Sequence, residues 1–191
     1  MEITPLAISG AYSIENTLHR DDRGEFVEWF RADRLQEATG LNFHTVQANL
    51  SLSEKGTVRG IHYADVPPGQ AKYVMCVAGA IRDFVIDIRV GSPTFGQWAS
   101  VDLDATSRNA VVLDVGLGHA FVALDPNTVV TYLVTDVYKP HAEHAINPLD
   151  TQVALDFPLP DSSLLLSPKD QAAPTLAQAM QEGRLPVWQG S

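Results

Sequence analysis

Apolar and polar residues alternate along most of the chain with a period of two, which is typical of half-buried β-strands. In residues 46–53, Val, Ala and two Leu residues alternate with Gln, Asn and two Ser residues. Segments rich in Gly and Pro interrupt this alternation at short intervals, as turns between strands do. We predict this strand and seven more, at Val58–Tyr63, Lys72–Val77, Ile81–Arg89, Gln97–Leu103, Ala110–Leu113, Ala120–Ala123 and Val129–Thr135.

Helical patterns are few and short. Ala32–Thr39 is followed by Gly40, and Thr175–Gln181 lies between a proline and a glycine. We read residues 116–118, Gly-Leu-Gly, as a turn. The pattern predicts an all-β, antiparallel sandwich or barrel with peripheral helices, formed by residues 1–191 as one domain. Residues from about 156 to 191 would be a C-terminal extension packing on the barrel.

Composition and charge exclude several classes of partner and of metal site. The 191 residues include 45% hydrophobic residues, enough for a substantial core, and 13 basic against 23 acidic residues give a net charge of −10. This charge argues against nucleic acid or an anionic membrane as partner. Cys76 is the single cysteine, which excludes an intramolecular disulfide and a thiolate-rich metal site. With no apolar run of membrane-spanning length and no secretory leader, we expect a cytoplasmic protein.

Several predicted strands carry polar residues where a barrel interior would otherwise be apolar. Gln47 and Asn49 share one face of their strand, and Tyr132 lies within an apolar strand. Any one of them alone is more often an outward-facing residue. Arg59 and His62 have opposite parity, so both can face one pocket only if their strand bulges, with the glycine between them as the natural place.

The sequence around these residues resembles the dTDP-4-dehydrorhamnose 3,5-epimerase family, sugar-nucleotide epimerases of the cupin type of jelly-roll barrel. Three segments carry the likeness most clearly: Arg59–Tyr63, Pro67–Tyr73 and Gly116–Phe121. Further matches, in the family's order, are Asp22–Phe26 with Glu28, Gln47–Asn49, Gly91–Gly96, Tyr132, Tyr138, Glu143–His144 and Leu166–Asp170. The match extends over residues 10 to 175 or so, which makes chance a poor explanation.

The resemblance implies a reaction on a dTDP-4-keto-6-deoxy sugar, whose ketone acidifies the hydrogens at carbons 3 and 5. Epimerisation then needs a base, an acid on the opposite face of the ring, and a cation or donor at the developing enolate oxygen. His62 matches the family's base, Asp170 the carboxylate that orients it, and Tyr132 the proton donor. Lys72 matches the residue near the ketone. No cofactor and no metal are expected.

The remaining implied ligand contacts would hold the nucleotide and the sugar. Arg23, Arg59 and Lys169 correspond to positions that hold the diphosphate or sugar, and Tyr138 to the aromatic residue that stacks on thymine. The family is typically a homodimer that exchanges N-terminal elements, which would place Arg23 and Glu28 in the partner's site. The other implied contacts are Phe26, Gln47, Asn49, His119 and Glu143. Four basic residues, the three above and Lys72, would then make one pocket positive inside an acidic protein.

Alternatives remain at this point. A metal-dependent cupin requires a His-x-His pair on an early strand, but residues 61–64 read Ile-His-Tyr-Ala, and His141 and His144 follow Pro140 in an expected surface loop. A non-catalytic sugar-nucleotide binding module is disfavoured because all four matched catalytic residues are present. Epimerisation at carbon 3 or carbon 5 alone is the runner-up within the family. We expect inversion at both carbons because that is the commoner reaction.

Overall fold

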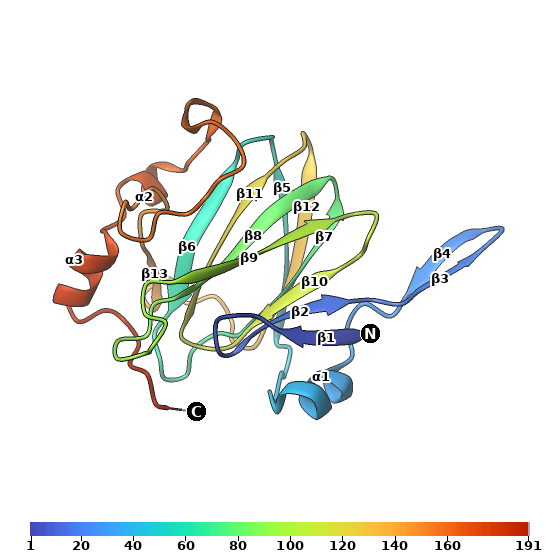
Figure 1. Ribbon diagram of the computed structural model, residues 1–191, viewed down its shortest axis with the longest axis horizontal. Coiled ribbons are helices and arrows are strands. Elements are labelled where there is room, and N and C mark those ends of the chain that lie inside the picture. The colour runs from blue at the N-terminus through green and yellow to red at the C-terminus, as the bar shows by residue number, and fades with distance from the viewer. Residues whose placement is uncertain (191) are drawn as a thin grey trace.

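The computed structural model describes residues 1–190 as two facing antiparallel sheets (Figure 1). All eight predicted strands are confirmed, with ends shifted by up to three residues. One sheet has the order β1 (Glu2–Pro5), β2 (Ala11–Glu15), β10 (Ala110–Leu113), β7 (Lys72–Ala78), β12 (Thr128–Val134), β5 (Gln47–Ser53). The other has the order β13 (Glu143–Ala145), β6 (Val58–Ala64), β11 (Leu117–Ala123), β8 (Ala80–Asp87), β9 (Trp98–Asp104).

Alternation along the strands sorts the apolar residues into three buried layers. Between the sheets, Val74 and Val130 meet Val85 and Phe121. The outer face of the five-stranded sheet is covered by the C-terminal segment, which carries α2 (Pro168–Gln171) and α3 (Leu176–Gln181). The outer face of the six-stranded sheet is covered in part by α1 (Ala32–Thr39). Each fully buried aliphatic or Phe side chain contributes about 1.5–3 kcal/mol of transfer free energy.

The two predicted helices are confirmed as α1 and α3, in place and in capping, whereas α2 was not predicted. Gly40 ends α1 in the left-handed conformation, with φ of 75°. Thr175 is the N-cap of α3 and forms a capping box with Gln178. Within residues 1–190, no helix is long and apolar enough to cross a membrane.

The bulge expected in β6 is present at Gly60. Opposite β11, His62 pairs with His119 and Arg59 with Phe121, so β6 has one residue more than its partner between these pairs. Gly60 has φ of 131°, and a Cβ on it would lie 2.4 Å from the Cβ of Ala120. Only glycine fits here. The bulge turns the side chains of Arg59 and His62 to the same face of the strand, toward the barrel interior.

The expected turn at residues 116–118 is wrong in part, because β11 already begins at Leu117. Gly118 lies inside the strand, where a Cβ would come within 2.7 Å of the Cγ2 atom of Ile61. This glycine therefore permits close packing within a strand and does not mark a turn.

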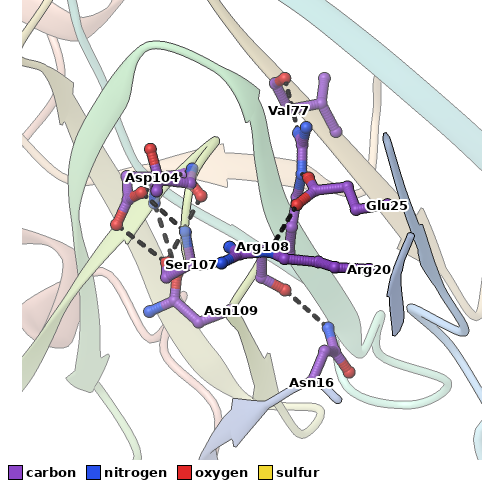
Figure 2. A network of polar contacts seen from close by, with 9 residues as sticks. Asn16, Arg20, Glu25, Val77, Asp104, Ser107, Arg108 and Asn109 are labelled. Carbon is purple, nitrogen blue, oxygen red and sulfur yellow. Dashed lines mark hydrogen bonds and ion pairs between the residues drawn. The ribbon is translucent and has the colours of Figure 1, made fainter. Parts of the chain in front are cut away.

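A two-stranded hairpin, β3 (Leu18–Asp21) and β4 (Gly24–Val27), projects from the barrel (Figure 1). The hairpin is bonded to the barrel through Arg108, as Figure 2 shows. The Nε atom of Arg108 donates to Glu25 of β4 at 2.9 Å, and Nη1 donates to the Val77 carbonyl of β7 at 3.1 Å. The Arg108 carbonyl accepts from the Asn16 side chain at 2.7 Å. These contacts join the hairpin, the segment before it and the sheet.

Candidate active site

A polar cavity of about 370 Å³ opens between the two sheets. Side chains from both sheets and from the C-terminal segment form its wall. His62 comes from the five-stranded sheet, whereas Lys72 and Tyr132 come from the six-stranded sheet. The full lining is Gln47, Asn49, His62, Gln70, Lys72, Tyr132, Tyr138, Glu143, His144 and Lys169. Eight of these ten were predicted from the sequence to contact a ligand or to act in catalysis.

The predicted pairing of His62 with Asp170 is present. The Nε2 atom of His62 lies 2.8 Å from Oδ1 of Asp170. The carboxylate side chain is 5% exposed, and the imidazole is 36% exposed. Ser167 holds the short helix α2 in place, because its hydroxyl accepts a hydrogen bond from the Asp170 amide at 3.0 Å.

The protonation of this pair follows from its surroundings. Burial raises the pKa of Asp170, but the hydrogen bond and positive potential from His62, together with the Ser167 hydroxyl, hold that pKa below its usual value. An ionised Asp170 accepts the Nε2–H of the imidazole, which leaves the Nδ1 lone pair free. The ring is thus fixed in the form in which Nδ1 can accept a proton.

Tyr132 lies on the facing sheet, directly opposite Asn49 in the β12–β5 register. Burial raises its pKa, and positive potential from Arg59 opposes this effect. Two hydrogen bonds of Gln47 link Asn49, the cross-strand neighbour of Tyr132, to the outer part of the cavity wall. Gln47 donates to the Asn49 side chain at 2.7 Å and accepts from the backbone amide of Tyr138 at 3.0 Å. Because Tyr132 and His62 line one cavity from opposite sheets, Tyr132 can supply a proton from the side opposite His62.

Lys72 is the buried cation of the cavity. It is buried, and within residues 1–190 its ammonium has no hydrogen bond or ion pair of its own. Burial lowers its pKa, whereas negative potential from Glu143 and Asp83 raises it. An ammonium in this position, with free donors, suits an anionic oxygen on a bound ligand.

Several residues matched to ligand contacts do not line the cavity of the same chain. The Arg59 guanidinium binds Ser53 Oγ at 3.1 Å and the Leu52 carbonyl at 3.2 Å. His119 is buried in the barrel interior beside Asp83. The other three, Arg23, Phe26 and Glu28, lie on the projecting hairpin or just after it.

The expectation that four basic residues share one pocket is therefore not met within one chain. Lys72 and Lys169 line the cavity, but Arg59 is drawn aside by its own hydrogen bonds. Arg23 pairs with Asp21 at the hairpin tip, where its side chain is 90% exposed. Arg23 lies in the turn between β3 and β4, and this hairpin projects from the barrel (Figure 1), so this fourth cation does not line the cavity of its own chain.

Three residues of the site escaped the sequence reasoning. Gln70 lines the cavity and donates to Glu143 at 3.3 Å. His144, expected on a surface loop, instead lies in β13, lines the cavity, and has its Nε2 2.6 Å from Asp65. Asp83 contacts His119 from the middle of an apolar strand. Gln70 and His144 lie within the matched segments Pro67–Tyr73 and Glu143–His144, which was the available signal. Asp83 had no signal beyond its inward parity.

A metal site is not assembled by these groups. Within residues 1–190 no three His, Cys, Asp or Glu side chains are grouped so that they could hold a metal ion. His62 and His144 instead form separate pairs, each with its own carboxylate. The arrangement suits proton transfer by individual side chains.

Comparison with known proteins agrees with this geometry. The family model for dTDP-4-dehydrorhamnose 3,5-epimerase matches residues 5–178. A dTDP-4-dehydrorhamnose 3-epimerase of Streptomyces niveus is 48% identical over 188 residues, 98% of this chain and 90% of that protein. A dTDP-4-dehydrorhamnose 3,5-epimerase of Mycolicibacterium smegmatis is also 48% identical, over 98% of this chain and 92% of that protein.

Solved structures show the same relationship. NovW, a 4-keto-6-deoxy sugar epimerase from the novobiocin cluster of Streptomyces spheroides, has a TM-score of 0.95 and 48% identity, covering 98% of this chain and 94% of its own. ChmJ, a 3'-monoepimerase of Streptomyces bikiniensis in complex with dTDP-quinovose, has a TM-score of 0.93 and 47% identity, covering 97% and 93%. The cupin-like fold expected from the sequence is confirmed. With nearly the whole length matched in sequence and in structure, the chain belongs to the dTDP-4-dehydrorhamnose 3,5-epimerase family.

Proposed function

We propose that the protein epimerises a dTDP-4-keto-6-deoxy sugar at carbons 3 and 5, with His62 as base and Tyr132 as acid. One observation carries the proposal: a carboxylate-paired imidazole and a tyrosine stand on facing sheets and line one cavity with a buried lysine. A base and an acid on opposite walls suit removal of a proton from one face of a ring and its return to the other.

The proposed steps balance without a cofactor. The Nδ1 atom of His62 takes the hydrogen next to the ketone, and the electron pair moves to the ketone oxygen to form an enolate. The Lys72 ammonium stabilises this oxyanion. Tyr132 gives its hydroxyl proton to the carbon from the opposite face, which restores the ketone and inverts the centre. The imidazolium then loses its proton, and the tyrosinate regains one, by exchange with water.

Bound ligands in relatives support the choice of substrate. ChmJ was solved with dTDP-quinovose, and an epimerase of Legionella pneumophila with dTDP-4-keto-L-rhamnose. In this chain, Lys169, Tyr138 and the amides of Gln47 and Asn49 line the cavity and offer the cation, aromatic ring and donors that such a nucleotide sugar needs. Inversion at carbon 3 alone is the second candidate, favoured by the equal identity to the 3-epimerase of S. niveus.

Exchange in heavy water tests the reaction. The protein is incubated with dTDP-4-keto-6-deoxyglucose, and deuterium at each ring carbon is followed by NMR. Incorporation at carbons 3 and 5 supports the double epimerase, whereas incorporation at carbon 3 alone assigns the second candidate. His62→Ala should abolish exchange at both carbons. Full exchange in this variant would show that another group is the base, and intact binding without exchange in the wild type would refute the function for this substrate.

We further propose that the protein is a homodimer in which the hairpin of each chain completes the other's site. Phe26, on the hairpin, is 65% exposed, and Leu50 and Leu52 on the outer face of β5 are 68% and 58% exposed. An apolar groove of about 410 Å³ lies between that face and the hairpin base. Exposed apolar surface of this kind is typical of an interface. Arg23 at the hairpin tip would then reach the partner's diphosphate.

Mixed dimers test the exchange of hairpins. Arg23→Ala and His62→Ala should each be inactive alone, because each removes one part of every site. Co-expressed, they should recover about a quarter of the wild-type rate, since half of randomly paired dimers contain one site with both residues intact. No recovery despite a dimeric mass in light scattering would place Arg23 outside the partner's site, and a monomeric mass would refute the dimer.

A further inference from the structure

Asp83 is a buried carboxylate that the proposed reaction does not use. It lies on β8 with 1% exposure, and its place in the strand alternation turns it toward the barrel interior. Its Oδ2 atom is 2.7 Å from Nε2 of His119. Its Oδ1 atom is buried and has no hydrogen-bond partner among the described residues. A carboxylate is costly to bury in this way, so its charge must be balanced by nearby groups.

His119 links Asp83 to the candidate base. It is the direct cross-strand partner of His62 in the β11–β6 register, so the two imidazoles come from neighbouring strands. Each uses Nε2 to contact its own carboxylate, Asp170 for His62 and Asp83 for His119. In residues 1–190 the Nδ1 atom of His119 has no hydrogen bond, and it is not among the fully buried polar atoms without partners. It therefore remains available to a hydrogen-bond partner.

Lys72 is the second group that faces Asp83. Burial raises the pKa of Asp83, and His119 and Lys72 oppose that rise. In return, Glu143 from β13 and Asp83 from β8 oppose the fall in the pKa of Lys72 that burial causes. Lys72 has no carboxylate in direct contact, so these two acids are the anionic groups that favour its ammonium form.

We propose that Asp83 is a positioning residue of the active site, which holds His119 with Nδ1 available to a hydrogen-bond partner and supplies counter-charge to the Lys72 ammonium. The role rests on the proposed function, because it matters only if Lys72 stabilises an enolate. Asp83 touches no substrate in this account. It acts through two side chains that come from different sheets, β11 of one and β7 of the other.

Asp83→Asn tests this role, since the amide keeps the shape and removes the charge. Without the negative potential of Asp83, the pKa of Lys72 falls further, so the ammonium is lost at lower pH. We expect the basic limb of the kcat profile to move to lower pH by about one unit, so that kcat at a given pH on this limb falls by up to about 10-fold, with KM changed much less. Asp83→Glu, which retains the charge, should keep the basic limb in place.

Asp114→Asn is the matched control, because this half-buried carboxylate lies before β11 and contacts none of the three groups. It should leave the pH profile unchanged. An Asp83→Asn enzyme with a wild-type profile, or with a uniform loss at every pH and a lowered Tm, would overturn the positioning role. If Asp83→Asn does not fold, His119→Gln serves as the test. This variant removes the imidazole but keeps the negative charge of Asp83 near Lys72, so a basic limb shifted to lower pH would contradict the proposal.

The two proposals fail in different ways. A wild-type protein that exchanges no hydrogen of dTDP-4-keto-6-deoxyglucose sinks the epimerase function whatever Asp83 does. An active wild type with an unaltered Asp83→Asn profile sinks the role of Asp83 alone.

Discussion

Asp170→Asn should inactivate the enzyme while leaving its fold and ligand binding intact. The substitution keeps the size of a side chain that is 5% exposed and contacts Nε2 of His62 at 2.8 Å. The new amide can donate to Nε2, which places the imidazole proton on Nδ1. That tautomer has no lone pair facing the cavity, and the imidazolium that forms during proton removal loses its counter-ion.

The expected loss follows from these two effects. A hydrogen bond to a charged group contributes about 1.5–3 kcal/mol, which corresponds to roughly 10- to 150-fold in rate if it acts on the transition state. The wrong tautomer adds to this, and a comparable Asp→Asn change behind a catalytic histidine costs about 10⁴ in kcat. We therefore expect kcat to fall about 10²- to 10⁴-fold.

The assay is the heavy-water exchange of each ring hydrogen, with thermal unfolding and dTDP binding measured on the same samples. Asp161→Asn serves as control, because this residue lies on the same C-terminal segment but is exposed in a 3₁₀ turn outside the cavity wall. Exchange by Asp170→Asn at the wild-type rate, with binding retained, would refute the reasoning that the carboxylate sets the tautomer of His62.

Three further changes separate catalysis from stability. Tyr132→Phe should retain exchange but lose inversion, which NMR of the product stereochemistry measures; inversion at the wild-type rate would rule out Tyr132 as acid. Gly60→Ala should lower the free energy of unfolding by about 1–3 kcal/mol and slow exchange, because the new Cβ would meet Ala120. Gly91→Ala is its control: no atom lies within 4 Å of the new Cβ, so this variant should add only backbone strain and leave exchange unchanged in the same assays. At Asp87, burial raises the pKa, but hydrogen bonds from Arg89, Ser92 and Thr94 prevail and lower it from 3.8 to about 2, a shift worth about 2 kcal/mol. This stabilisation is present above about pH 4 and is lost as the pH falls toward 2, so Asp87→Asn should lower the free energy of unfolding by about 2 kcal/mol at pH 7 and much less at pH 2 in urea titrations; an equal loss at both pH values would contradict the assignment.

Strands β10 and β11 are buried on both faces and were predictable as short apolar runs bounded by turn residues, whereas the barrel strands that expose one face show a period of two. Strand β5 shows this best, since Gln47, Asn49 and Ser51 face inward and Leu50 and Leu52 face out. The short strands β1 to β4 and β13 escaped prediction. Their three to five residues are too few for a period to emerge, and β3 and β4 are largely exposed.

The site residues could be predicted where they lie in segments that match the family's sequence. His62 and Asp170 are 108 positions apart, and no pattern in either segment indicates that they touch; the family resemblance supplied the pair. Helix α2 has only four residues in a segment rich in Pro and Ser, so no periodic pattern of apolar residues predicts it. The position of Arg23 in space depends on the direction of the hairpin, which contacts with Arg108 determine.

Asp170, the carboxylate paired with His62, is synthesised after all the strands of the barrel. The last barrel strand, β13, ends at Ala145, but Asp170 stands 25 residues further on, in a segment that closes over the finished sheet. Until this segment has left the ribosome, His62 lacks its partner and the apolar outer face of the five-stranded sheet lacks its cover. A chain truncated before α2 therefore loses the charged pair and exposes that apolar face, and a tag or fusion is safer at a site remote from α2.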